Sequence, residues 1–199
     1  MTQYWRQIVA GTITAAAVVV FISVGGRALW SAPEPEAAAS ALEATAPAAH
    51  APASALPVRL RVPAINVDAA VQHVGLGQTG NMAVPSNYTD VGWYRYGPIP
   101  GGEGSAVIDG HVDNGLALPG VFYHLSEVRV GDEIFVDAAS TTTRFVVTKI
   151  ASYPEAQVPT DEIFSTTGPA RLVLITCDGT WIQGERMYDH RLVVYATKA

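Results

Sequence analysis

The pattern of apolar and polar residues changes twice along the chain and divides it into three parts. Residues 7–26, QIVAGTITAAAVVVFISVGG, contain no charged side chain, and residues 31–57 are mostly alanine and proline. From Val58 onward, short β-branched and aromatic runs alternate with Gly, Pro, Asn and Asp. The sequence therefore predicts an N-terminal membrane anchor over residues 1–30, a linker over 31–57 and a folded domain over 58–199.

The uncharged run of 20 residues is long enough to cross a bilayer. As a helix it would span ~30 Å, the thickness of the hydrocarbon core. Trp5 and Trp30 flank it, as interfacial aromatic residues do. A cleaved signal peptide is the alternative, but its apolar region usually has only about 7 to 15 residues. We expect a retained single-pass anchor with the folded domain outside the cell membrane.

The second segment has the composition of a tether. Its 27 residues include no aromatic side chain and cannot bury enough apolar surface to offset the entropy of ordering. A flexible chain of this length averages ~30 Å from end to end. The tether would hold the folded domain clear of the membrane surface.

The third segment shows the short, evenly spaced apolar runs of an all-β domain. Eight strands over about 140 residues indicate a sandwich or a barrel. A tight hairpin is expected over 128–136, an irregular loop over 97–104 and a short helix near residue 160. The predicted strands are 58–62, 69–74, 105–109, 121–125, 133–137, 143–150, 171–176 and 191–196.

Net charge limits the partners of this domain. The chain carries a formal charge of -6 and has a pI near 5.2. Nucleic-acid binding needs a clustered cationic surface that displaces counterions from phosphates. We therefore expect no nucleic-acid partner.

The only cysteine, Cys177, lies in RLVLITCDGT, where an apolar run meets Asp178-Gly179. A lone thiol cannot form an intramolecular disulfide, so three roles stay open: a buried packing residue, an intermolecular cross-link or a nucleophile. The near-continuous apolar run indicates a central strand that ends at Cys177 in a turn. A strand end is both rigid and accessible, which favours a nucleophile.

A cysteine nucleophile needs a group that accepts and returns its proton, and histidine is the usual choice. Of five histidines, His111 alone follows a predicted strand directly, in AVIDGHVDNG. A solvated turn histidine is the alternative. Asp109, His111 and Asp113 also form an alternating ligand set, but a metal usually needs a further ligand, so we expect no metal.

Acyl transfer further needs donors for the oxygen on which negative charge develops. Arg191 opens the last predicted strand and would lie level with Cys177 if the two strands are neighbours. Arg144, Arg171 and Arg186 are rivals that sequence spacing alone does not exclude.

These residues together resemble the sortases, the cysteine transpeptidases of the Gram-positive cell envelope. The family pattern Thr-Leu-x-Thr-Cys corresponds to residues 173–177, with Val173 in place of the first threonine, and the family histidine corresponds to His111 in GHVDN. The resemblance extends from Arg59 to Tyr195 and is greatest to the actinobacterial class F group.

The resemblance implies a closed eight-stranded β-barrel with short helices. Cys177 would attack a sorting signal of the Leu-Pro-x-Thr-Gly (LPxTG) type on a secreted protein and form a thioester, and His111 would protonate the leaving amine. Arg191 would bind the substrate backbone and the oxyanion, and Thr176 would help to position the peptide. Residues 151–169 would form the substrate-recognition loop.

The same resemblance implies no cofactor, and as acceptor a cell-wall precursor or another cell-envelope amine. The cysteine L,D-transpeptidases are a rival class, but their Ser-His-Gly-Cys stretch is absent from the sequence. A non-enzymatic rival is a membrane-anchored structural domain whose thiol forms an intermolecular disulfide.

Overall fold

The computed structural model describes residues 53–114, 116 and 118–199. The predicted membrane span and almost all of the predicted linker lie outside this range. Within the described residues, no helix is long and apolar enough to cross a membrane.

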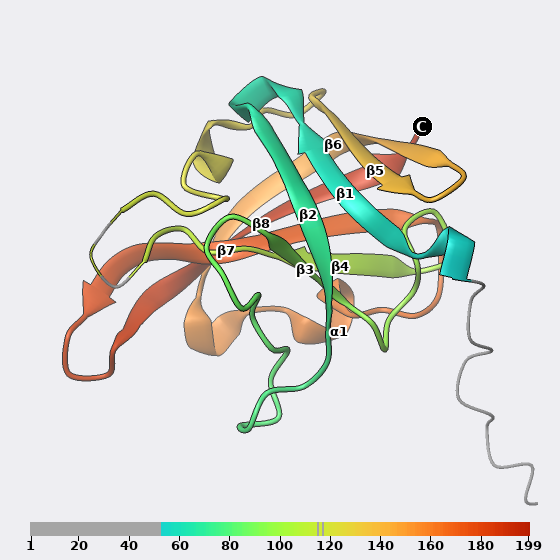
Figure 1. The fold of residues 1–199 in the computed structure, drawn as a ribbon. Helices are drawn as coiled ribbons and strands as arrows, with labels where there is room; N and C mark the ends of the chain where they lie inside the picture. Colours follow the sequence, from blue (N-terminus) through green and yellow to red (C-terminus); the bar gives the residue numbers. More distant parts are fainter. Residues whose placement is uncertain (1–52, 115, 117) are drawn as a thin grey trace, which may run out of the picture. The chain divides into compact units, whose positions relative to one another are not determined.

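Eight strands close into one barrel, which confirms the predicted all-β class (Figure 1). Their order around the barrel is β1-β2-β3-β4-β7-β8-β6-β5. The β2–β3 and β4–β7 pairs are parallel, and the other pairs are antiparallel. The strands are β1 (Pro57–Val62), β2 (Val67–Val74), β3 (Val91–Tyr94), β4 (Ser105–Asp109), β5 (Glu133–Ala138), β6 (Thr142–Pro154), β7 (Arg171–Ile182) and β8 (Met187–Lys198).

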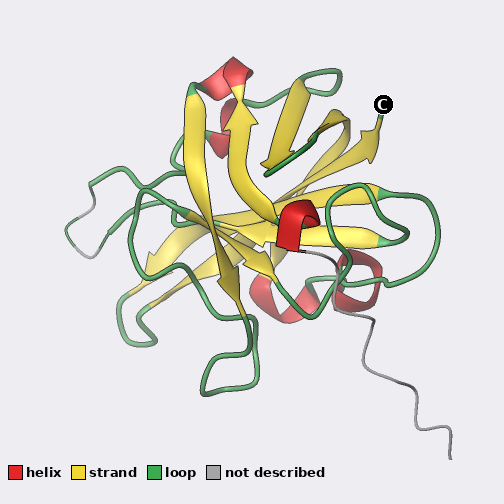
Figure 2. Cartoon of the chain, turned by 45° about the vertical axis from the view of Figure 1, so that its right-hand side comes forward, coloured by secondary structure: helices red, strands yellow, loops and turns green. Residues whose placement is uncertain are grey.

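Short helical turns precede β1 or lie in the connections between strands (Figure 2). They are η1 (Ala53–Ala55), η2 (Pro63–Ile65), η3 (Leu125–Glu127), η4 (Glu155–Gln157) and α1 (Thr160–Ile163). The predicted helix near residue 160 is therefore confirmed as α1. The stretch 97–104 contains only turns and bends, as its glycines and prolines predict.

One predicted strand is wrong. Residues 121–125 form turns that lead into η3, and their two fully buried side chains, Phe122 and Leu125, are three residues apart. That spacing fits a helical turn, whereas a strand buries every second residue. The eighth strand is instead β3, which has four residues and follows the polar stretch SNYTD.

The predicted hairpin over 128–136 is also wrong. Residues before β5 form a turn, in which Gly131 donates its N–H to the carbonyl of Val147, 2.9 Å away. β5 pairs with β1 and β6 instead. A glycine between two apolar runs predicts a turn, but the partner strand lies elsewhere in the sequence.

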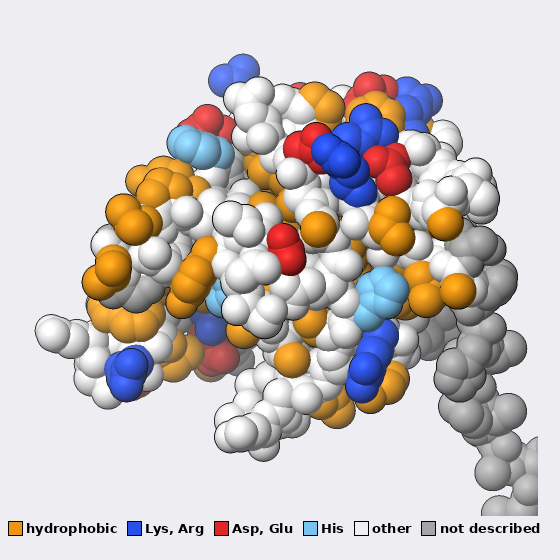
Figure 3. All heavy atoms as spheres, viewed as in Figure 1, with side chains coloured by type: hydrophobic (Ala, Val, Ile, Leu, Met, Phe, Trp, Pro, Cys, Tyr) orange, Lys and Arg blue, Asp and Glu red, His pale blue; other side chains and the backbone are white. Residues whose placement is uncertain are grey.

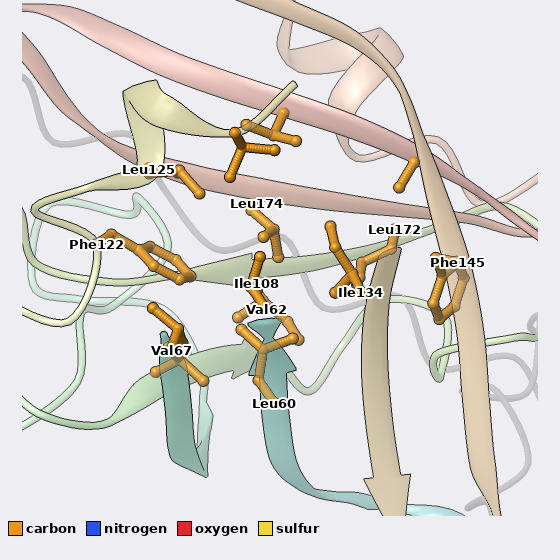
Figure 4. Close-up of a cluster of buried hydrophobic side chains, with 14 of the residues drawn as sticks. Leu60, Val62, Val67, Ile108, Phe122, Leu125, Ile134, Phe145, Leu172 and Leu174 are labelled. Carbon is orange, nitrogen blue, oxygen red and sulfur yellow. The ribbon is translucent and has the colours of Figure 1, made fainter. Parts of the chain in front are cut away.

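Buried side chains form two clusters on opposite faces of β4, β7 and β8. The larger cluster fills the barrel and includes Ile108, Leu172 and Leu174 (Figure 4). The smaller one includes Val107, Val173 and Val193, and it is covered by Ile163 of α1. Because side chains alternate along a strand, these three strands are buried on both faces.

Phe122 links the barrel core to the segment that follows β4. Its ring is fully buried in the larger cluster, and its N–H donates to the carbonyl of His111, 2.9 Å away. We expect Phe122→Ala to lower the free energy of unfolding by about 3 to 5 kcal/mol, because it leaves a cavity. Urea denaturation followed by tryptophan fluorescence measures this loss.

Tyr123→Ala is the matched control, because the adjacent Tyr123 side chain is 47% exposed. A loss below about 1 kcal/mol is expected for it. Equal losses in the two variants would contradict the assignment of Phe122 to the core.

Candidate functional site

Strand β7 carries the thiol and lies between β4 and β8. Cys177 pairs with Arg191 of β8 in the antiparallel register. On the other side, the pairing of β7 with β4 ends at Ile175 and Asp109. Cys177 therefore has a strand neighbour on one side only, and its side chain is partly exposed.

The predicted turn at Asp178-Gly179 is wrong, because β7 continues to Ile182. The register with β8 shifts between Asp178 and Trp181, and Gly179 has a φ of 80°. A glycine with positive φ allows this irregularity without ending the strand. Gly179 therefore marks a distortion of the strand next to the thiol, and not the turn that the sequence predicted.

The alternation of side chains assigns Cys177 to the outer face of the barrel. Val173 is part of the smaller cluster and Ile175 packs against it, whereas Leu172 and Leu174 point into the barrel. Cys177 shares the face of Val173 and Ile175 because it is two residues further along the strand. The same alternation places Arg191 on the face of Val193.

The backbone after β4 brings His111 level with Cys177. Gly110 donates its N–H to the carbonyl of Ile175 at 3.1 Å. The Thr176 hydroxyl donates to the carbonyl of Gly110 at 2.8 Å. These bonds extend the contact between the β4 segment and β7 to Gly110, so His111, the next residue, follows at the end of this pairing where Cys177 lies.

The imidazole of His111 is oriented by two contacts. Its Nε2 lies 3.1 Å from the carbonyl oxygen of Pro85. A carbonyl only accepts hydrogen bonds, so Nε2 carries a proton and Nδ1 is the nitrogen left for proton exchange. The ring of Tyr88 packs against the imidazole at a centroid distance of 4.7 Å.

The guanidinium of Arg191 is held by its own strand. Nη1 donates to the carbonyls of Tyr188 and His190 at 2.9 and 2.8 Å. No described residue accepts a hydrogen bond from Nε or Nη2 of Arg191. These donors can serve a substrate carbonyl or an oxyanion in the same region.

The pKa of Cys177 is raised, chiefly by burial of the thiol. The positive charge of Arg191 opposes this rise, and the carboxylates of Asp113 and Asp109 add to it. A thiol with a raised pKa is mostly protonated at neutral pH and attacks only when a base takes its proton. His111 is the base that the backbone register supplies.

The structure brings Cys177, His111 and Arg191 to one edge, and it separates the rival arginines from them. Arg171 begins β7, six residues before Cys177, and Arg144 on β6 pairs with Glu133. Arg186 lies in the β7–β8 turn with a φ of 54°.

Thr176 is 4% exposed, and its hydroxyl bonds the backbone directly before His111. Its direct contact with a peptide stays a prediction.

The alternating set Asp109, His111 and Asp113 does not form a metal-binding group. In the described part of the chain, no three His, Cys, Asp or Glu side chains are placed to hold a metal ion. Asp113 instead accepts a hydrogen bond from the hydroxyl of Tyr188, and Asp109 is turned into the protein.

The sequence predicted Asp109 only as a possible metal ligand and did not reveal that its carboxyl oxygen is buried. Its Oδ1 is buried without a hydrogen-bond partner, and burial raises the pKa of this carboxyl to about 8. A Cβ on Gly92 would lie 2.5 Å from Oδ1, so the glycine makes room for the carboxyl. The apolar run SAVID gives no signal that its final carboxyl is buried.

The fold is thus a closed β-barrel with a cysteine and an arginine paired across two strands and a histidine level with them. A sequence model of the sortase domain matches residues 60–199. The chain belongs to the sortase family. The predicted class F assignment stays a prediction, because the similar structures below are named sortase C or sortase A.

Solved structures of sortases share the fold. Sortase C-1 from Actinomyces oris is 25% identical, with a TM-score of 0.56 and coverage of 72% of each chain. A lid mutant of sortase A from Corynebacterium diphtheriae is 22% identical, with a TM-score of 0.56 and coverage of 72% of this chain and 70% of its own. Sortase C1 of GBS pilus island 1 is 22% identical, with a TM-score of 0.53.

This chain spans 64% of the GBS sortase, which covers 71% of this chain. No curated protein matches the sequence.

Burial of Asp109 has a consequence for stability. Its pKa is about 8 in the folded chain and near 3.8 in the unfolded one, so the folded state holds an extra proton between these values. Stability is therefore lost as the pH rises through this window. We expect Asp109→Asn to have a higher free energy of unfolding than the wild type at pH 8, by several kcal/mol, and to show little difference at pH 4.

Thermal unfolding of both proteins at pH 4, 6 and 8 measures this difference. A gap that does not widen with pH would contradict the burial of a protonated Asp109.

Proposed function

We propose that this protein is a cysteine transpeptidase that cleaves LPxTG-type sorting signals and transfers the acyl group to a cell-envelope amine. Membership of the sortase family supports the general class. The observation that carries the proposal is the pairing of Cys177 with Arg191 across β7 and β8, with His111 level with the thiol on the opposite side.

The proposed reaction has two acyl-transfer steps. The Cys177 thiol gives its proton to His111, and the sulfur attacks the threonine carbonyl of the signal. The C–N bond to glycine breaks, the glycine amine takes the proton from His111, and the acyl group stays on Cys177 as a thioester. A second amine then attacks the thioester and loses its proton to His111, the C–S bond breaks, and the leaving sulfur takes that proton to restore the thiol.

Arg191 would stabilise the oxyanion of both tetrahedral intermediates. Its charge already acts on the sulfur, since it lowers the pKa of Cys177 against the effect of burial. The two unused guanidinium nitrogens can donate to an oxygen bonded to the attacked carbon.

The outer face beside Cys177 offers an apolar surface for the signal peptide. Ile175 is partly buried there and packs with Val158 and Phe164 against the smaller cluster. Both Val158 and Phe164 belong to the segment after β6, which the resemblance assigns to substrate recognition. The predicted loop 151–169 begins later in the structure, because β6 extends to Pro154.

Cleavage of a fluorogenic Leu-Pro-x-Thr-Gly peptide by the purified full chain tests the proposal. We expect Cys177→Ala to abolish turnover, and mass spectrometry of the wild type to show the acyl group on Cys177. Equal turnover by the variant and the wild type would refute the proposed function.

Arg191→Lys tests the oxyanion role. A single ammonium does not reproduce the guanidinium fork, which holds two strand carbonyls with Nη1 and keeps Nε and Nη2 as further donors. We expect kcat/KM to fall by about 100-fold, as for loss of an oxyanion donor. Arg186→Lys in the β7–β8 turn is the matched control and should keep wild-type turnover.

The disulfide alternative has its own test. It predicts a band of doubled mass on a non-reducing gel that Cys177→Ser removes.

We also propose that residues 7–26 anchor the chain in the cell membrane. Deletion of residues 1–30 should move the protein from the membrane fraction to the soluble fraction. A wild-type protein already found in the soluble fraction would refute the anchor.

A further inference from the structure

A hydrogen bond joins the two segments that carry His111 and Arg191. The hydroxyl of Tyr188 on β8 donates to Oδ2 of Asp113, which lies two residues after His111. The two residues are 75 positions apart in the sequence. The bond therefore connects the β7–β8 hairpin to the segment that follows β4.

Tyr188 contacts Arg191 directly, and it contacts the segment that carries His111 through Asp113. Its carbonyl accepts a hydrogen bond from Nη1 of Arg191 at 2.9 Å, and its ring packs edge-on against Trp181 at 5.2 Å. The backbone of Tyr188 thus holds the guanidinium, while its side chain holds Asp113. One residue restrains both sides of the site.

The segment around Asp113 is itself well ordered by hydrogen bonds. Gly120 donates its N–H to the carbonyl of Val112 at 2.8 Å, and Phe122 donates to that of His111 at 2.9 Å. Asp113 forms an isolated bridge with Pro119. Asp113 and His111 are therefore both attached to the same segment, residues 119–122.

We propose that Tyr188 and Asp113 are a positioning pair that holds His111 and Arg191 at Cys177 and shields the thiol from the Asp113 charge. The inference rests on the proposed function for its kinetic part only. Reactivity of the thiol toward an alkylating agent tests the electrostatic part without any peptide substrate.

Asp113 and Tyr188 have different effects on the thiol, because one is charged and the other is a neutral hydrogen-bond donor. Asp113 raises the pKa of Cys177, and its hydrogen bond raises the pKa of Tyr188 to about 12, so the phenol stays a donor at neutral pH. Besides Asp113, the charged groups that act on the thiol are Arg191 on β8 and Asp109 at the end of β4. His111 follows β4, Tyr123 adds to the rise in the pKa of Tyr188, and Asp178, the next residue on β7, accepts a hydrogen bond from Ser152 at 2.6 Å.

Tyr188→Phe and Asp113→Asn should shift the pKa of Cys177 in opposite directions. Tyr188→Phe leaves the Asp113 carboxylate without its donor, so the pKa of Cys177 should rise. Asp113→Asn removes the negative charge, so the pKa of Cys177 should fall. The rate of iodoacetamide alkylation of the full chain, measured from pH 6 to 10, gives both values.

Tyr188→Phe and Asp113→Ala should lose catalysis, because each removes one partner of the bond, whereas the amide oxygen in Asp113→Asn can still accept it. We expect kcat for the signal peptide to fall about 10- to 100-fold in each, with KM within about threefold of the wild type, because the reacting groups are misplaced and not the peptide surface. Tyr188→Phe/Asp113→Asn should match Asp113→Asn alone in alkylation.

Tyr96→Phe is the matched control. The Tyr96 hydroxyl accepts a hydrogen bond from Arg95 at 2.8 Å, and its side chain is 58% exposed. Tyr96→Phe should change neither the rate of alkylation nor the kcat for the peptide. Shifts of the thiol pKa in the same direction in both single variants, or no shift in either, would overturn the pair, even if the peptide is cleaved.

If alkylation shifts as expected and no variant or wild type cleaves the peptide, the positioning pair stands and the proposed function fails.

Discussion

The site depends on the pairing of β7 between a parallel strand that stops early and an antiparallel strand that continues. β8 supplies Arg191 opposite Cys177, and the end of β4 leaves room for the backbone that carries His111. A slip of one residue in β7 would turn Cys177 into the barrel and Thr176 outward, because side chains alternate across a strand. Burial on both faces opposes such a slip, since it would exchange the leucines of one cluster with the valine and isoleucine of the other.

The inner face of β7 carries core residues, whereas its outer face carries the thiol. Leu172, Leu174 and Thr176 face the barrel interior, where Thr176 uses its hydroxyl to hold the backbone before His111. Cys177 lies on the outer face at the margin of a smaller apolar cluster. Figure 3 shows that one face of the molecule carries scattered charged groups among extensive apolar and neutral surface. The rigid interior thus positions groups that remain within reach of a peptide.

The electrostatics of the site favour a neutral thiol at rest. Burial and two carboxyl groups raise the pKa of Cys177, and Arg191 offsets only part of this effect. The protein also keeps a buried, unpartnered carboxyl oxygen at Asp109, which costs stability at neutral pH. Arrangements that cost stability, such as a buried carboxyl oxygen without a hydrogen bond, occur most often at functional sites. The thiol therefore needs a base before it can act as a nucleophile.

Spacing left Arg191 among four candidate arginines, and only the pairing of β7 with β8 decides that it lies opposite Cys177. The sequence by itself determined the all-β class, seven of the strands, and the lone thiol with a candidate histidine, because apolar alternation and short motifs are local properties. It did not reveal that 121–125 forms turns, since Phe122 and Leu125 become core residues only when the barrel closes around them. It also gave no sign of the Tyr188–Asp113 bond or of the burial of Asp109. Those features join or enclose residues that are far apart along the chain, and only the tertiary structure decides which of them meet.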